Sequence, residues 1–192
     1  MEISSAYYNN ICVTVFTAVV WFKSGDEVQH CSYVIARSYS YVIASDELTH
    51  DKTAVNAFNK ALIEDLRSKG VLVNHIHFFI DGAASLFENK FTAQNLVHHQ
   101  DEFGCSAGWS YFETGHGKGP VNGMGGTVKR KVLLDVYDGH STIHNASSFA
   151  YEAKRLFPQS ITILYVPSST LKYIERWGSA QTVPKIRMSH FL

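Results

Sequence analysis

The segment HIHFFID at residues 75–81 ends in a carboxylate that could bind a metal ion. Because side chains alternate along a strand, four of its residues share one side: His75, His77, Phe79 and Asp81. A carboxylate at the end of a rigid central strand is typical of enzymes that use divalent cations in phosphoryl transfer. An aspartate at this position can also cap the turn that follows, and the segment alone favours that simpler role. The two histidines are interpreted as core residues of an apolar strand.

A glycine-rich segment, TGHGKGPVNGMGG at residues 114–126, is the second place where chemistry could occur. A Walker loop ends in Gly-Lys-Ser or Gly-Lys-Thr, whereas Gly117-Lys118 is followed here by another glycine. The dinucleotide-binding fingerprint needs a glycine at its sixth position, and counting from Gly117 that position is Asn122. Both phosphate-binding motifs therefore fail, and we expect a flexible loop that presents His116 and Lys118.

Three consecutive basic residues follow these glycines: Lys129, Arg130 and Lys131. Clustered lysine and arginine side chains could contact the phosphates of DNA. The alternative is a solvated helix face, preceded by glycines that serve sharp turns, and this segment alone favours that alternative.

The elements that must position these residues begin with a strand over residues 12–22, which is rich in Val, Phe and Thr. The sequence SYVIA then occurs twice, at residues 32–36 and 40–44. The copies could be consecutive strands, one strand with a long bulge, or a small duplication tolerated at a sheet edge. A helix follows, capped by Thr49 or Asp51 and ended by Lys69-Gly70. Its apolar residues recur at spacings of three and four: Val55, Phe58, Leu62 and Leu66.

The remaining elements alternate between strand and helix. They are, in order, a central parallel strand at 75–80, a helix over about 88–103 closed by Gly104, a strand at 109–112, a helix near 147–157, a strand at 161–166 and a helix from Ser168 or Ser169 to Gly178. This order predicts an α/β fold with one mixed sheet flanked by helices.

The composition predicts one intracellular domain without a strong overall charge. At 192 residues the chain is long enough to bury a sizeable core. Its 17 basic and 17 acidic side chains cancel, so any attraction to nucleic acid must be local. Three widely spaced cysteines fit neither a disulfide framework nor a zinc cluster, which favours a reducing compartment. The apolar run at residues 11–22 is too short to span a bilayer, so we expect no membrane association.

Three segments resemble, in this order and at similar spacing, a large set of proteins from arthropods and other animals: SDELTHDKTAV (45–55), FFIDGAASLFENKF (78–91) and WSYFETGHGKGPVNGMGGTVKR (109–130). Those proteins are similar to the RNase H-like catalytic cores of DDE-type transposases. The resemblance covers most of the chain and is densest over residues 43–131. It implies a single RNase H-like domain over residues 1–192, built on a mixed sheet flanked by helices.

The resemblance implies that Asp81 is the second of three metal-binding carboxylates, with Mg²⁺ or Mn²⁺ as the ion. Where relatives commonly have a further aspartate, two residues after His-Gly-Lys-Gly, this chain has Asn122. An asparagine can coordinate a cation through its carbonyl oxygen but brings no charge. In the same chemistry His116 would position a water or a leaving oxygen, and Lys118 would contact a phosphate.

The beginning of the chain also departs from the family. Relatives have an acidic strand upstream of this region, whereas no aspartate lies in residues 1–25, Asp26 falls in a turn, and Glu2 is close to the free end. We therefore expect a domain that is shortened at its N-terminus and lacks the first strand. Asp46 follows the second SYVIA copy and could lie near the same sheet edge, but it is interpreted first as a loop or helix-start residue.

Three functions compete. The favoured one is a transposase-derived domain, catalytically impaired, that binds DNA in the nucleus through Lys118, Lys129, Arg130 and Lys131. The second is an active metal-dependent nuclease or transposase that uses Asp81 and His116, with Asn122 in the third position. The third is a structural or protein-interaction domain with neither activity.

Overall fold

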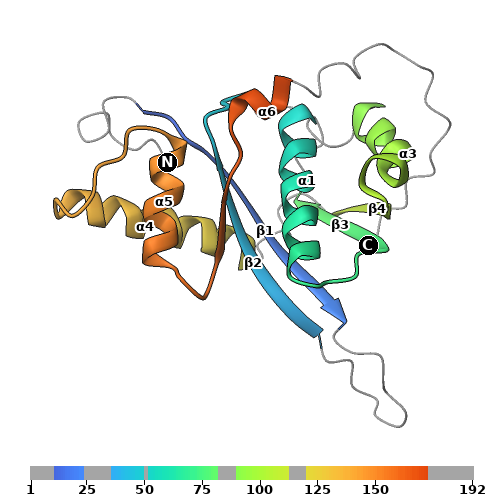
Figure 1. The fold of residues 1–192 in the computed structure, drawn as a ribbon, viewed down its shortest axis with the longest axis horizontal. Coiled ribbons are helices and arrows are strands. Elements are labelled where there is room, and N and C mark those ends of the chain that lie inside the picture. Colours follow the sequence, from blue (N-terminus) through green and yellow to red (C-terminus); the bar gives the residue numbers. More distant parts are fainter. Residues whose placement is uncertain (1–10, 24–35, 50–51, 82–89, 113–119, 173–192) are drawn as a thin grey trace, which may run out of the picture. The chain divides into compact units, whose positions relative to one another are not determined.

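The computed structural model describes residues 11–23, 36–49, 52–81, 90–112 and 120–172 (Figure 1). These residues form five helices and five strands, and the strands make two small sheets. The predicted α/β class is confirmed, although one sheet was expected. The chain divides into two compact units that are interleaved in the sequence: unit 1 contains residues 1–46 and 120–165, and unit 2 contains residues 47–119 and 166–192. The single domain over residues 1–192 stays a prediction.

The sheet of unit 1 is mixed. It contains β1 (Thr14–Lys23), β2 (Ala36–Ser45) and β5 (Thr162–Tyr165), in the order β1-β2-β5. β1 and β2 are antiparallel, whereas β2 and β5 are parallel. The strands predicted at 12–22 and 161–166 are confirmed, with small shifts of their ends.

The second SYVIA copy lies entirely within β2, and the first contributes its last residue, Ala36. β2 pairs with β1 residue for residue, from Thr14 opposite Ser45 to Lys23 opposite Ala36. The described part of the repeat is therefore one uninterrupted strand without a bulge. Residues 32–35 lie outside the described ranges.

Two helices, α4 (Pro120–Tyr137) and α5 (Ala146–Leu156), cover one face of this sheet (Figure 1). α5 begins with a capping box, in which the Asn145 side chain accepts the Ser148 N–H at 2.8 Å and the Ser148 hydroxyl accepts the Asn145 N–H at 3.0 Å. This confirms the helix predicted near 147–157. The core between sheet and helices contains Val42, Ala44, Val128, Val132, Ile143, Ala146, Phe149, Ala150, Ala153, Phe157 and Ile163.

The described residues of unit 2 form a two-stranded parallel sheet and three helices. Its elements are α1 (Lys52–Ser68), β3 (His75–Asp81), α3 (Lys90–Phe103), β4 (Ser106–Phe112) and α6 (Ser168–Lys172). The helices and strands predicted in this part of the chain are confirmed, although β4 begins at Ser106 rather than at residue 109. The predicted start of the second helix at residue 88 and the predicted end of the last helix at Gly178 lie outside the described residues. None of the helices in the described ranges combines the length and the apolar character needed to cross a membrane.

The ends of α1 and α3 follow the predicted chemistry. Gly70 and Gly104 lie just after these helices and have φ angles of +78° and +65°. Glycine adopts this left-handed conformation without the steric cost that a Cβ atom imposes, so it stops each helix. At the start of α1, Asp51 lies outside the described residues, and the Thr49 N–H is instead bonded to the Glu47 carboxylate at 3.0 Å.

The prediction that β3 is a buried central strand is wrong for the described residues. Its one partner there is β4, and its residues alternate between two environments. Phe78 packs against His99 of α3 and Trp109 of β4, with ring centroids 5.9 and 4.7 Å apart. Phe79, on the opposite face, is 60% exposed. A strand with one covered face needs apolar residues only on that face. The apolar run at residues 75–80 therefore predicted more burial than β3 has.

Candidate functional site

Asp81 is the last residue of β3, where it pairs with Phe112 of β4. The predicted place of this aspartate, at the carboxyl end of a parallel strand, is therefore confirmed. Its side chain is not among the described parts of the structure, and His116 and Lys118 also lie outside the described residues. Within the described ranges, no three His, Cys, Asp or Glu side chains gather closely enough to hold a metal ion. A Mg²⁺ or Mn²⁺ site at Asp81 stays a prediction.

Asn122 is exposed in the first turn of α4, and this corrects part of the predicted loop. Residues 120–126, PVNGMGG, are helical rather than a flexible segment. Pro120 suits the first helical position because its fixed φ matches the helix and its missing N–H would have no partner there. The Thr127 hydroxyl donates to the Gly123 carbonyl at 2.8 Å inside the same helix.

Gly125 explains why glycine occurs inside this helix. A Cβ atom built on Gly125 would lie 2.9 Å from Cγ2 of Thr17 on β1, whereas Gly123 and Gly126 have nothing within 4 Å of that position. Gly125 is also buried. The missing side chain therefore lets α4 approach β1 closely, which outweighs the low helix propensity of glycine.

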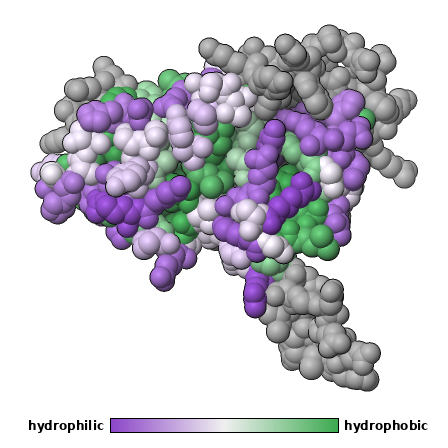
Figure 2. Space-filling model, in the orientation of Figure 1, coloured by the Kyte–Doolittle hydropathy of each residue, from purple (hydrophilic) through white to green (hydrophobic). Residues whose placement is uncertain are grey.

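Three of the four predicted DNA-contacting residues lie on α4 and are exposed: Lys129, Arg130 and Lys131. Their neighbours Val128 and Val132 are 0% and 1% exposed and fix the inward side of the helix. The surface over α4 and α5 is largely hydrophilic, at the left of Figure 2. The predicted helix face for the basic residues is therefore confirmed, and a DNA contact stays a prediction.

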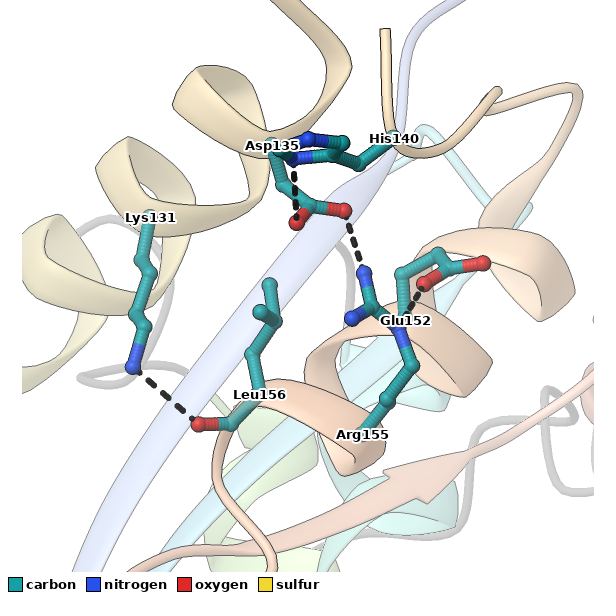
Figure 3. Close-up of polar contacts among 6 residues, drawn as sticks. All are labelled: Lys131, Asp135, His140, Glu152, Arg155 and Leu156. Atoms are coloured by element: carbon teal, nitrogen blue, oxygen red, sulfur yellow. Dashed lines mark hydrogen bonds and ion pairs between the residues drawn. The ribbon is translucent and has the colours of Figure 1, made fainter. Parts of the chain in front are cut away.

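Lys131 differs from the other two because it has a structural role. Its ammonium group donates to the carbonyl oxygen of Leu156 at 3.3 Å (Figure 3). It also lies 4.9 Å from the ring centroid of Phe157. A cation at the last carbonyls of α5 is favourable because these groups form the negative end of the helix dipole.

Arg155 of α5 is also held by neighbouring groups. It bonds to Glu152 at 2.7 Å and to Asp135 of α4, and His140 lies beside Asp135 (Figure 3). The hydrogen bond with Glu152, assisted by Asp135, raises the pKa of Arg155.

Lys129 and Arg130 are the two basic residues of α4 that have no protein partner within the part of the chain that the structure describes.

Asp46 is a structural residue, as the loop or helix-start interpretation expected. One carboxylate oxygen accepts the backbone N–H of Ala146, the first residue of α5, at 2.9 Å. The other accepts the hydroxyl of Tyr165 on β5. This hydrogen bond to Asp46 raises the pKa of the Tyr165 phenol. Both oxygens of Asp46 are thus used to join β2, α5 and β5.

His75 and His77 were predicted to be core residues, and this prediction is wrong. Both are exposed on the same face of β3 as Phe79. His75 Nδ1 lies 2.7 Å from the Ser106 hydroxyl, and His77 Nε2 lies 2.8 Å from the Ser110 hydroxyl. The alternation along HIHFFID indicated that these rings share one side, but nothing in the sequence showed that this side is exposed.

A buried polar group on the other side of the β3–β4 sheet was missed. His99 of α3 is 3% exposed, and its Nδ1 lies 2.7 Å from the carbonyl oxygen of Cys105. Desolvation by burial lowers the pKa of His99 and raises the pKa of the Cys105 thiol. Within the described residues the second ring nitrogen of His99 has no hydrogen-bond partner. Burial therefore favours the neutral form of this histidine.

Comparison with known proteins assigns the chain to a protein family. The family described as Domain of unknown function (DUF8701) matches residues 1–192, so the chain belongs to this family. Neither a curated protein nor a solved structure matches it significantly.

Proposed function

We propose that the chain is a transposase-derived, RNase H-like domain that binds DNA and is catalytically impaired. The observation that carries the DNA-binding part is the pair Lys129 and Arg130, which α4 holds at the surface with no protein partner in the described ranges. Because the chain has no net charge, a local cationic pair is the feature that would attract a phosphate backbone. A DNA ligand implies a nuclear location.

The order of elements supports the proposed ancestry. A transposase core of this type places one carboxylate at the end of a central strand and another on or before a later helix. Here Asp81 ends the parallel strand β3, which has one strand partner in the described residues and is not central there. α4 carries Asn122 in its first turn, after α3 and β4.

The proposed impairment follows from Asn122. An amide in place of a carboxylate removes one negative charge from a site that would hold two divalent cations, and it lowers their affinity. The competing function, an active metal-dependent nuclease, is favoured by Asp81 at the carboxyl end of β3.

The test is binding of the full chain to duplex DNA at several salt concentrations, without and with Mg²⁺ or Mn²⁺. Replacing both Lys129 and Arg130 by alanine should weaken binding at low salt. It should also reduce the slope of log affinity against log salt by about 2, because each phosphate contact contributes roughly 0.9. Fluorescence anisotropy of a labelled duplex measures both quantities.

The matched control replaces Lys60 of α1 and Lys154 of α5, two exposed lysines, by alanine. This variant loses the same charge and should keep the wild-type slope. Equal slopes for both double variants and the wild type would contradict the α4 contact. Cleavage that needs the metal and disappears in Asp81→Asn would contradict the impaired domain and support the active nuclease. Absence of DNA binding at low salt would contradict both of these functions and support the protein-interaction domain.

A further inference from the structure

The exposed face of the β3–β4 sheet carries a row of three rings: His75, His77 and Phe79. Adjacent rings have centroids 6.4 Å and 4.7 Å apart, so the row is continuous along the strand. The opposite face of β3 is the packed one, where Phe78 contacts His99 and Trp109. The rings of the row are therefore additional to those that the core of unit 2 needs.

Partners on β4 hold the two imidazoles in place. Ser106 and Ser110 are hydrogen-bonded to His75 and His77 at 2.7 and 2.8 Å. A Cβ atom on Gly108 would lie 2.9 Å from Nδ1 of His77, so the imidazole occupies the space above this glycine. Rings that are fixed before binding lose little conformational entropy when a ligand arrives.

The chemistry of this face suits flat aromatic ligands. Phe79 is 60% exposed, and its ring centroid lies 4.7 Å from that of His77, so the two rings form one continuous aromatic surface. The described side chains of the face are two imidazoles, one phenyl ring and the serine hydroxyls beside the imidazoles, of which Ser110 is buried. Rings exposed on a sheet stack with unpaired bases, and this interaction tolerates any base sequence.

We propose that the row His75, His77 and Phe79 binds the unpaired bases of a single-stranded nucleic acid by stacking. This inference rests on the proposed function, because both need a nucleic-acid ligand. It adds a second surface, on unit 2, that recognises bases, whereas Lys129 and Arg130 of unit 1 would contact phosphates.

The test compares binding of the full chain to a short labelled oligothymidylate and to a duplex of equal length. Phe79→Leu keeps an apolar side chain but removes the ring, and it should weaken single-strand binding about 5-fold or more with an unchanged salt slope. Phe79→Tyr keeps the ring and should bind within about 2-fold of the wild type. Tyr151→Leu, which removes an exposed ring from α5, is the matched control and should have no effect.

Each outcome decides the inference separately from the proposed function. An unchanged affinity in Phe79→Leu, or an equal loss for duplex and single strand, would overturn base stacking, while the effect of Lys129 and Arg130 on duplex binding could persist. Loss of stacking in Phe79→Leu, together with no effect of the Lys129 and Arg130 replacements, would support this inference and remove the α4 contact. If neither nucleic acid binds to the wild type, both proposals fail. A parallel titration with oligouridylate shows whether DNA or RNA supplies the bases.

Discussion

Single residues of the same type have different roles here because their surroundings differ. Lys129 and Lys131 are two positions apart on α4, yet Lys131 is bonded to the Leu156 carbonyl and Lys129 has no protein partner in the described ranges. Asp46 and Asp81 both occur at the end of a strand, but both carboxylate oxygens of Asp46 already accept hydrogen bonds. Surroundings, and not residue type, decide which side chain could meet a ligand.

Replacing Asp46 by alanine should lower the free energy of unfolding. The change leaves the Ala146 N–H and the Tyr165 hydroxyl without their shared acceptor, and hydrogen bonds to a charged group contribute about 1.5–3 kcal/mol. Asp46→Asn keeps one carbonyl acceptor and should lose less. Denaturant unfolding measures the difference, with Asp138→Ala, at an exposed position after α4, as control. A loss no larger than that of Asp138→Ala would show that Asp46 does not join these elements.

His99 should make the protein less stable in acid. Burial lowers its pKa in the folded state, so as the pH falls below the ordinary value of 6.5 the unfolded chain binds more protons than the folded one. The free energy of unfolding therefore decreases with falling pH in this range. Glu102 and the Cys105 carbonyl oppose the shift, whereas Arg67 and His75 reinforce it.

Denaturant unfolding at several values between about pH 5 and 8 tests this dependence. His99→Asn retains an N–H that can donate to the Cys105 carbonyl but has no group that titrates in this range, so its curve should be flatter. His144→Asn changes an exposed histidine and should follow the wild type. Parallel curves for all three proteins would contradict a neutral, buried His99.

At the scale of elements, the glycine-rich start of α4 allows this helix to pack closely against β1. Gly125 removes the Cβ atom that would collide with Thr17 on β1, and Pro120 begins the helix. The sequence pattern was interpreted as a loop because three glycines within four residues are unfavourable for an isolated helix. A contact with a distant strand outweighs local propensity, and it cannot be deduced from the segment alone.

Alanine at these glycines should therefore have opposite effects. Gly123→Ala should stabilise the protein by about 0.5–1 kcal/mol, because it improves helix propensity and the space around it is open. Gly125→Ala should destabilise it by about 1–3 kcal/mol, because the new methyl group would meet Thr17.

Thermal unfolding distinguishes the two alanine variants. Thr17→Ser removes the methyl group that the new Cβ would meet, so it should restore part of the stability of Gly125→Ala. A stabilising Gly125→Ala would contradict the close approach of α4 to β1.

At the scale of the whole molecule, the order and type of the elements could be predicted except for α4, whose glycine-rich start was interpreted as a loop. The environment of the elements could not be predicted. The spacing of Phe58, Leu62 and Leu66 was sufficient to predict α1, because all three are buried on one side of the helix. Gly70 and Gly104 allowed the ends of α1 and α3 to be predicted, because glycine adopts the left-handed conformation that ends a helix. The exposure of His77 and Phe79 depends on which elements cover each face of β3, and no local pattern contains that information.

The interleaved order of the two units affects how the chain folds as it is made. The hairpin of β1 and β2 exposes Val42 and Ala44 until α4 and α5 arrive to cover them, and residues 47–119 lie between. At a synthesis rate of about 5–20 residues per second, α4 begins roughly 4–15 s after Asp46 is added, and α5 is complete after roughly 6–22 s. During translation the nascent hairpin would thus keep its apolar side uncovered for several seconds, and exposed apolar surface of this kind is prone to aggregation.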